Sequence, residues 1–238
     1  MNLDYHSYLV VIFRMEPQKR ITVDLSLISV NVVDTLLLDS TTDPSILDEI
    51  ARENTHRPEI LNLFLTHPLT PEDTREFAGS TLKMPVATEP VETEEPHEYK
   101  QVKAQSLLQR VQTMGTGDKM QLAVKGSREI RSILLRDPRE EILVAVLNNP
   151  KISHSEIELL SKQKTTSADI LREIAKNKTW LRSYSIIHCL ISNPKTPSGI
   201  SIKHIHNIRT KDLKFIEKDK NLPEAVRANA KKLLIARK

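Results

Sequence analysis

The sequence is poor in several residues that particular folds and sites require. A single cysteine among 238 residues excludes an internal disulfide framework and a zinc site built from several cysteines, and it favours a reducing, cytoplasmic location. Five glycines leave few positions for tight hairpins or phosphate-binding loops. Aromatic residues make up only 4%, whereas Leu and Ile are plentiful, which favours packed helices over a β-sandwich. We therefore expect an all-α protein.

The chain also lacks a long apolar segment. No run approaches the roughly 18 apolar residues that a membrane-spanning helix needs. The short run Tyr8–Phe13 follows Asp4 and has no basic region before it, so it does not resemble a secretion signal. We expect no membrane span.

Charge is distributed unevenly along the chain. Residues 1–99 hold 7 Lys and Arg against 18 Asp and Glu, a net charge of −11, whereas residues 100–238 hold 28 against 13, a net charge of +15. This division indicates either that the basic half meets an acidic partner or that the two halves attract each other.

A Pro- and Glu-rich stretch, MPVATEPVETEEPHEY, occupies residues 84–99. Proline lacks a backbone donor and like charges repel, so this composition predicts a flexible acidic linker. The predicted organisation has four parts: an N-terminal extension (1–22) without assigned structure, a short N-terminal helical-repeat segment (23–83), the linker (84–99), and a basic C-terminal helical-repeat domain (100–238).

Helix boundaries recur with similar residues on both sides of the linker. Ser153 with Glu156 matches a capping box at a helix start. In HCLISNPKTP, Pro194 prevents a helix from continuing, and we expect Thr196 to cap the next helix while Pro197 presets its φ angle. Such a segment predicts a turn between two consecutive helices.

Two blocks of the chain align with each other. ILDEIA at 46–51 and ILREIA at 170–175 differ only at Asp48 and Arg172, and each precedes an apolar helix that ends in HPLTP or SNPKTP. This pattern resembles bacterial HEAT-like repeats, especially the leucine-rich repeat variant group. The resemblance covers residues 43–74 and 118–236. It implies an α-solenoid in two segments, joined by the linker, that serves as a binding scaffold.

One feature of that group is missing from this sequence. A member of the group carries a cysteine-ligated iron–sulfur cluster before its repeats, but Cys189 is the sole cysteine here. The closest histidine pair, His204 and His206, has a spacing that points the two side chains to different sides of a helix. No HExxH, GxSxG or phosphate-loop motif is present. We therefore expect no cofactor, no metal site and no enzymatic activity.

Basic and aromatic residues are the remaining signal. A cationic row can neutralise phosphates or bind an acidic protein, and an aromatic side chain can stack on bases or peptides. The ordinary alternatives are a solvated helix face for the cations and a core position for the tryptophan. We predict a non-enzymatic scaffold that binds an acidic protein partner through a basic surface, with nucleic-acid binding as the alternative. The candidate partner-binding residues are Lys125, Arg128, Arg131, Arg136, Arg139, Trp180, Arg182 and Tyr184.

Overall fold

The computed structural model describes residues 23–84 and 106–237. Within these two ranges the chain forms helices and no strand, which confirms the all-α prediction. The predicted N-terminal extension, and the predicted linker apart from Met84, lie outside the described residues.

The chain divides into two compact units. Unit 1 comprises Met1–Leu134 with Asn148–Pro150, and unit 2 comprises Leu135–Leu147 with Lys151–Lys238. Unit 1 joins helices from before and after residues 85–105, because α2 packs against α7. The domain bounds given above stay predictions.

Unit 1 consists of short helices, and side chains cap the starts of η1, α2 and α3. The Asp43 carboxylate accepts a hydrogen bond from the Ser45 N–H at 3.0 Å, and Pro44 occupies the first helical position of α3. Residues 106–113 are also helical. The other elements are η1 (Leu25–Leu27), α2 (Val30–Leu38), α3 (Pro44–Glu53), α4 (Pro58–Thr66), α5 (Glu72–Leu82), α7 (Thr116–Lys125) and α8 (Arg128–Leu134).

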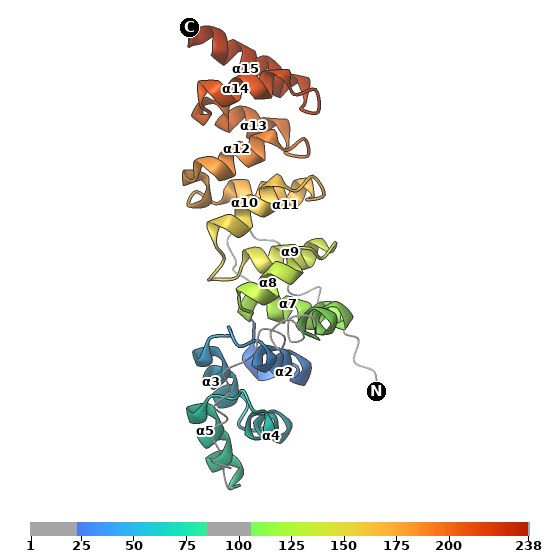
Figure 1. Ribbon diagram of the computed structural model, residues 1–238, viewed down its shortest axis with the longest axis vertical. Helices are drawn as coiled ribbons and strands as arrows, with labels where there is room; N and C mark the ends of the chain where they lie inside the picture. The colour runs from blue at the N-terminus through green and yellow to red at the C-terminus, as the bar shows by residue number, and fades with distance from the viewer. Residues whose placement is uncertain (1–22, 85–105, 238) are drawn as a thin grey trace, which may run out of the picture. The chain divides into compact units, whose positions relative to one another are not determined.

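Unit 2 consists of helices that follow one another in chain order (Figure 1). Each of α10, α12 and α14 packs against a helix that comes later in the chain. Successive turns between these helices lie at alternate edges of unit 2 (Figure 1). The elements are α9 (Glu140–Leu147), α10 (His154–Lys162), α11 (Ala168–Lys176), η2 (Trp180–Arg182), α12 (Tyr184–Ser192), α13 (Ser198–His204), η3 (Ile205–Asn207), α14 (Thr210–Lys218) and α15 (Glu224–Ala236).

The core of unit 2 is built from isoleucine and leucine at helical spacing. Leu213 and Ile216 of α14 are buried against Val226 and Ala230 of α15. Burying side chains of this size contributes roughly 1.5–3 kcal/mol each relative to leaving them in water. Because these buried positions recur every three or four residues, they leave the remaining faces of the helices to polar side chains.

Three turns on one edge of unit 2 share one backbone geometry. In these turns, which we call corners (163–167, 193–197 and 219–223), the N–H of the fourth residue donates to the carbonyl of the first. The distances are 3.3 Å from Thr166 to Gln163, 3.0 Å from Thr196 to Asn193 and 3.1 Å from Leu222 to Asp219. The fourth residue is buried in each corner, so it packs inward between the two helices.

The prediction that Thr196 caps a helix is wrong. Pro197 occupies the N-cap position of α13 and makes no side-chain cap hydrogen bond. Thr196 is buried one residue earlier, because the corner turns its side chain inward. The capping box of α10, in contrast, is confirmed: the Glu156 N–H donates to Ser153 Oγ at 3.3 Å and the Ser153 N–H donates to the Glu156 carboxylate at 2.7 Å.

Buried asparagines join successive turns. Asn193 Nδ2 donates to the carbonyls of Ser161 and Gln163 at 2.9 Å each, and so ties its corner to the preceding corner in unit 2. Asn149 makes the equivalent bonds in unit 1, to Ala123 at 2.9 Å and Gly126 at 3.2 Å. The last carbonyls of a helix have no partner within it. These amides therefore satisfy backbone groups that would otherwise be buried without a hydrogen bond.

Candidate basic interface

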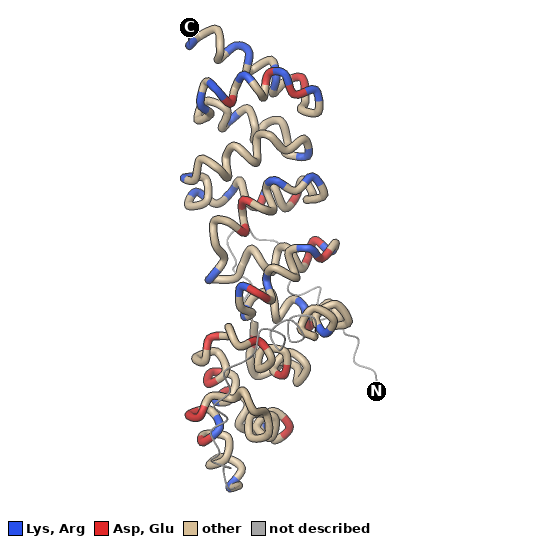
Figure 2. Tube along the Cα trace, viewed as in Figure 1, with Lys and Arg blue, Asp and Glu red and all other residues tan. Residues whose placement is uncertain are grey.

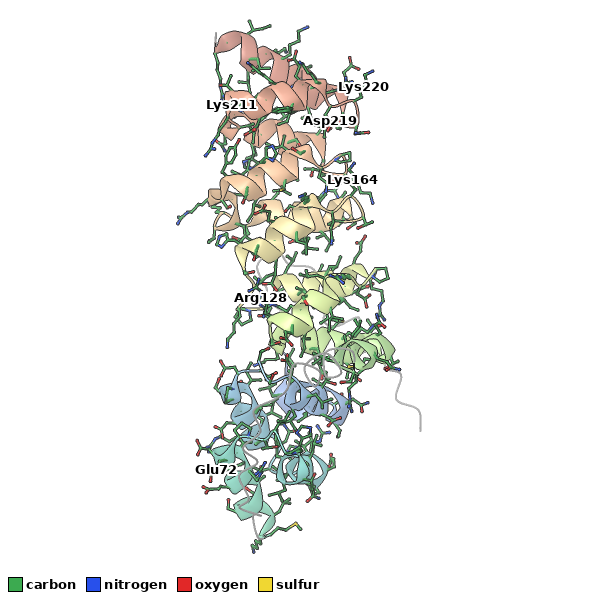
Figure 3. All side chains as sticks on the ribbon, viewed as in Figure 1. Glu72, Arg128, Lys164, Lys211, Asp219 and Lys220 are labelled. Atoms are coloured by element: carbon green, nitrogen blue, oxygen red, sulfur yellow. The ribbon has the colours of Figure 1, made fainter. Side chains whose placement is uncertain are left out.

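The structure divides the eight predicted site residues between the two units. Lys125, Arg128 and Arg131 belong to unit 1, and the other five belong to unit 2. Lys125 Nζ lies 3.3 Å from the Glu49 carboxylate, and Arg128 is exposed at the start of α8 (Figure 3). The eight residues therefore do not form one site within a single unit.

Arg131 is a structural residue. Its side chain is 3% exposed, and its Nη1 donates to the Gly126 carbonyl at 3.1 Å and to Asn149 Oδ1 at 3.4 Å. Burial of a guanidinium requires hydrogen bonds that compensate for lost hydration. The charge of Arg131 is therefore directed at the interior of unit 1, and a partner on the surface has no access to it.

The two cations of the segment before α9 differ from each other. Arg136 is exposed. The Arg139 guanidinium forms an ion pair with Asp137 at 2.9 Å, and the hydrogen bond to Asp137 is the main reason that the pKa of Arg139 rises above its ordinary value. Only Arg136 of this pair presents an uncompensated charge to solvent.

Tyr184 joins two helices of unit 2. Its hydroxyl donates to the Asp212 carboxylate and accepts the Arg209 N–H at 3.2 Å, while the Arg209 guanidinium lies 4.4 Å from the ring centroid. Burial raises the pKa of the Tyr184 hydroxyl, and the bond to Asp212 adds to this effect. Because Arg209, the N-cap residue of α14, lies over the Tyr184 ring, that face of the ring already holds a cation.

Arg182 and Trp180 precede Tyr184 in η2. Arg182 is exposed, whereas Trp180 is half-buried. A half-buried tryptophan presents part of its ring to solvent while the rest packs on the unit. The Arg182 charge is therefore accessible from solvent, and Trp180 adds a partly exposed apolar surface beside it.

Exposed cations gather on the edge of unit 2 that carries η2 and η3. The two elements are neighbours because both pack against α12, and Tyr184 connects the start of α12 to Arg209. We call this cluster the basic edge. Its members, all exposed, are Lys178, Arg182, Lys203, Arg209 and Lys211.

Sequence reasoning found only one member of the basic edge, Arg182. The signal that identifies the other members is an absence of carboxylates: no Asp or Glu occurs between Glu173 and Asp212. Asp212, which ends this stretch, is engaged with the Tyr184 hydroxyl. The local field at this edge is therefore positive, and a nearby anion meets no competing carboxylate within the stretch.

The opposite edge of unit 2 carries the three corners. Figure 3 labels Lys164 and Lys220 on this corner edge, together with Asp219, and labels Lys211 on the other side of the unit. Lys164 and Lys220 are exposed, as the lysines of the basic edge are. They therefore provide matched controls for experiments on the basic edge.

The net charge of the two units has opposite sign. Unit 2 contains 21 Lys and Arg against 11 Asp and Glu, a net charge of +10, whereas unit 1 contains 14 against 20, a net charge of −6. Figure 2 shows the acidic residues of unit 1 along α2, α3 and α5. The excess positive charge of the chain belongs to unit 2.

Two other titratable groups of unit 2, His204 and Cys189, are half-buried. Burial lowers the pKa of His204, with smaller contributions from Lys203 and His206. Burial also raises the pKa of the Cys189 thiol, which disfavours the thiolate that a nucleophile or metal ligand requires. Within residues 23–84 and 106–237, no group of three or more His, Cys, Asp and Glu side chains is placed to hold a metal ion.

Across the residues with assigned structure, no helix is long and apolar enough to cross a bilayer. Comparison with protein families, curated proteins and solved structures finds no match for this chain.

Proposed function

We propose that the chain is a non-enzymatic helical-repeat scaffold that binds an acidic protein partner through the basic edge of unit 2. The observation that supports this proposal is the set of exposed cations between Glu173 and Asp212, which meets no carboxylate within that stretch. Counter-charges from a partner provide the compensation that the unit itself lacks.

The repeat architecture is part of the same proposal. Helices that pack in chain order, buried asparagines that connect successive turns, and corners of one geometry are what an α-solenoid of HEAT-like type requires. The corner at 193–197 and the turn after α9 each place an asparagine on the carbonyls of an earlier helix end. Repetition of one hydrogen bond supports repetition of one structural unit. We place the protein in the cytoplasm on the strength of its single, half-buried cysteine.

A binding titration of the full chain tests the protein-binding proposal. The probe is a fluorescently labelled poly-L-glutamate of about 20 residues, which spans at most about 70 Å in extended form. The double variant Lys178→Glu/Arg182→Glu is expected to weaken binding at least about tenfold. The control variant Lys164→Glu/Lys220→Glu changes the net charge by the same amount on the corner edge and is expected to change affinity by less than about twofold. Equal losses in both variants would show that only total charge matters.

Nucleic-acid binding is the alternative, because the same cations can contact phosphates. A single-stranded DNA probe of the same length, titrated at several salt concentrations, separates the two. Counterion release makes the affinity for nucleic acid fall steeply with salt, with a slope of about −0.7 per phosphate neutralised on a single strand. If the full chain does not bind the DNA even at about 0.05 M salt, the alternative is discarded.

A further inference from the structure

The outer face of α14 carries an exposed aromatic side chain between two lysines. Phe215 is 73% exposed, the largest value for a large hydrophobic side chain in the described ranges. Lys214 and Lys218, one helical turn apart, are also exposed. Leu213 and Ile216 point the opposite way, into the core, so the outer face plays no part in folding α14 onto α15.

The carboxylates nearest to this face are engaged or partly covered. Asp212 accepts the Tyr184 hydroxyl, Asp219 accepts the Asn221 N–H at 2.9 Å, and Glu217 is half-buried. An apolar ring flanked by cations fits a surface that has the reverse composition, with an apolar side chain beside carboxylates.

Unit 1 carries a surface of that reverse composition. Leu69 is exposed in the turn between α4 and α5, and Glu72, Asp73 and Glu76 are exposed in the first turns of α5. The one cation within this run, Arg75, directs its Nη2 to the carbonyls of that turn, at 3.2 Å from His67 and Pro68 and 3.3 Å from Thr70. The acidic face of α5 is therefore not neutralised by its neighbour.

The two faces match in spacing as well as in charge. Glu72 and Glu76 lie one helical turn apart on α5, as Lys214 and Lys218 do on α14, and one turn advances about 5.4 Å. Two such helices can lie alongside each other with both charge pairs opposed.

We propose that the Phe215 face of α14 in one molecule binds the Leu69–Glu76 face of unit 1 in a second copy of this chain. The two faces belong to different surfaces, so the contact is heterologous, and a bound pair of copies leaves one face of each kind open for the next copy. Such contacts produce rings of molecules where they close and open chains where they do not. This inference goes beyond the function proposed above, because its partner is a second copy of the chain and Lys214, Phe215 and Lys218 are not members of the basic edge, although Lys211 of that edge lies on the same side of α14.

Sedimentation velocity of the full chain tests the proposal. The average mass is expected to rise with protein concentration between about 10 μM and about 1 mM at about 0.05 M salt, and to fall towards the monomer at about 0.5 M salt, where exposed charges are screened over a few ångströms. A chain that stays monomeric throughout this range at low salt would overturn the proposal.

Charge-swapped variants identify the two faces. Lys214→Glu/Lys218→Glu and Glu72→Lys/Glu76→Lys are each expected to remain monomeric when alone, because like charges then face each other. An equimolar mixture of the two variants is expected to associate again, since each swapped face meets its complement. A mixture that stays monomeric while both variants keep their helical circular dichroism would contradict the pairing.

The apolar contribution is tested by Phe215→Ser, which is expected to weaken self-association at least about tenfold without a change in net charge. The control Lys164→Glu/Lys220→Glu is expected to associate as the unmodified chain does. Failure of the poly-L-glutamate experiment leaves these outcomes unaffected, because Lys214, Phe215 and Lys218 lie outside the basic edge. A loss of association that is equal in the corner-edge control would assign the effect to net charge and overturn the proposal.

Discussion

Arg57 in unit 1 and Arg237 in unit 2 perform the same structural task. Arg57 Nη1 donates to the carbonyls 31 and 29 residues earlier, those of Ser26 at 3.2 Å and Ile28 at 2.7 Å. Arg237 donates to carbonyls at the same separations of 31 and 29 residues, those of His206 and Ile208, at 2.6 Å each. A guanidinium next to a helix, at the N-cap of α4 in unit 1 and at the C-cap of α15 in unit 2, thus satisfies carbonyls of a preceding 3₁₀ turn and the residue after it.

The other cations of the two units differ in the carboxylates with which they form ion pairs. In unit 1, Arg110 pairs with Asp34, Lys125 pairs with Glu49, and Arg131 is buried with bonds to the Gly126 carbonyl and Asn149 Oδ1. The two ion pairs connect the acidic N-terminal part of the chain with the first helices of its basic half, as in the second of the two alternatives that the charge division left open. In unit 2, the ion pairs Arg172–Asp169 and Lys176–Glu173 stay within one helix. The five cations of the basic edge are exposed.

The largest expected difference between the two units is in the free energy of unfolding after a glycine is replaced by alanine. A Cβ added at Gly126 would lie 2.4 Å from the Leu122 carbonyl oxygen and 2.7 Å from Ile130 Cγ2. Gly126→Ala is therefore expected to lower the free energy of unfolding by about 3 kcal/mol. A Cβ at Gly199 would meet no heavy atom within 4 Å, so Gly199→Ala in unit 2 is expected to be neutral or to stabilise by up to about 1 kcal/mol. Urea denaturation of both variants measures the difference.

The second prediction separates the two arginines of α8. Arg131→Met removes a buried charge and leaves the carbonyl of Gly126 and Asn149 Oδ1 with fewer donors, so we expect a loss of about 2 kcal/mol in the free energy of unfolding. Arg128→Met changes an exposed side chain and is expected to cost less than about 0.5 kcal/mol. Similar losses from the two substitutions in thermal unfolding would contradict the structural assignment of Arg131.

Buried threonines of the corners provide the third prediction. Thr166 Oγ1 donates to the Leu160 carbonyl at 2.8 Å, whereas the buried Thr196 Oγ1 has no hydrogen-bond partner among the described residues. Thr166→Val is therefore expected to cost about 1 kcal/mol of stability, and Thr196→Val is expected to be neutral or slightly stabilising. Thermal denaturation of the two isosteric variants side by side provides the measurement, and the reverse order would be the unexpected result.

The smallest expected effect is a pH dependence at His204. Burial lowers the pKa of His204 below its ordinary value of 6.5, so the folded protein binds fewer protons at this site than the unfolded chain. Stability is then expected to fall as the pH drops below about 6.5, towards the lower pKa of the folded state. His204→Gln is expected to reduce this slope, and denaturation curves between about pH 5 and pH 8 reveal whether it does. An unchanged slope would exclude His204 as its source.

Much of the fold was predictable from local sequence. Apolar periodicity, the Ser153–Glu156 capping box and the Asp43–Pro44 helix start depend on residues within a few positions of one another. The role of Thr196 was mispredicted because a threonine before Pro-Ser has the composition of an N-cap, while the inward turn of the corner depends on packing between helices.

The candidate interface was predicted less well than the fold. Cation spacing along α8 did not reveal that Arg131 is buried, since its partners, Gly126 and Asn149, lie 5 and 18 residues away along the chain. The basic edge brings η2 and η3 together through α12, and cation spacing within single segments does not detect this juxtaposition. The stretch without carboxylates between Glu173 and Asp212 was visible in the sequence and is the feature that identifies the edge.

One binding measurement compares the two units directly. Affinity for the labelled poly-L-glutamate is determined for the full chain with Lys178→Glu/Arg182→Glu in unit 2 and with Lys125→Glu/Arg128→Glu in unit 1, which change the net charge equally. If unit 2 provides the binding surface, the first variant loses at least about tenfold in affinity and the second stays within about twofold of the unmodified chain. Greater weakening by the unit 1 substitutions would contradict the assignment of the interface to the basic edge.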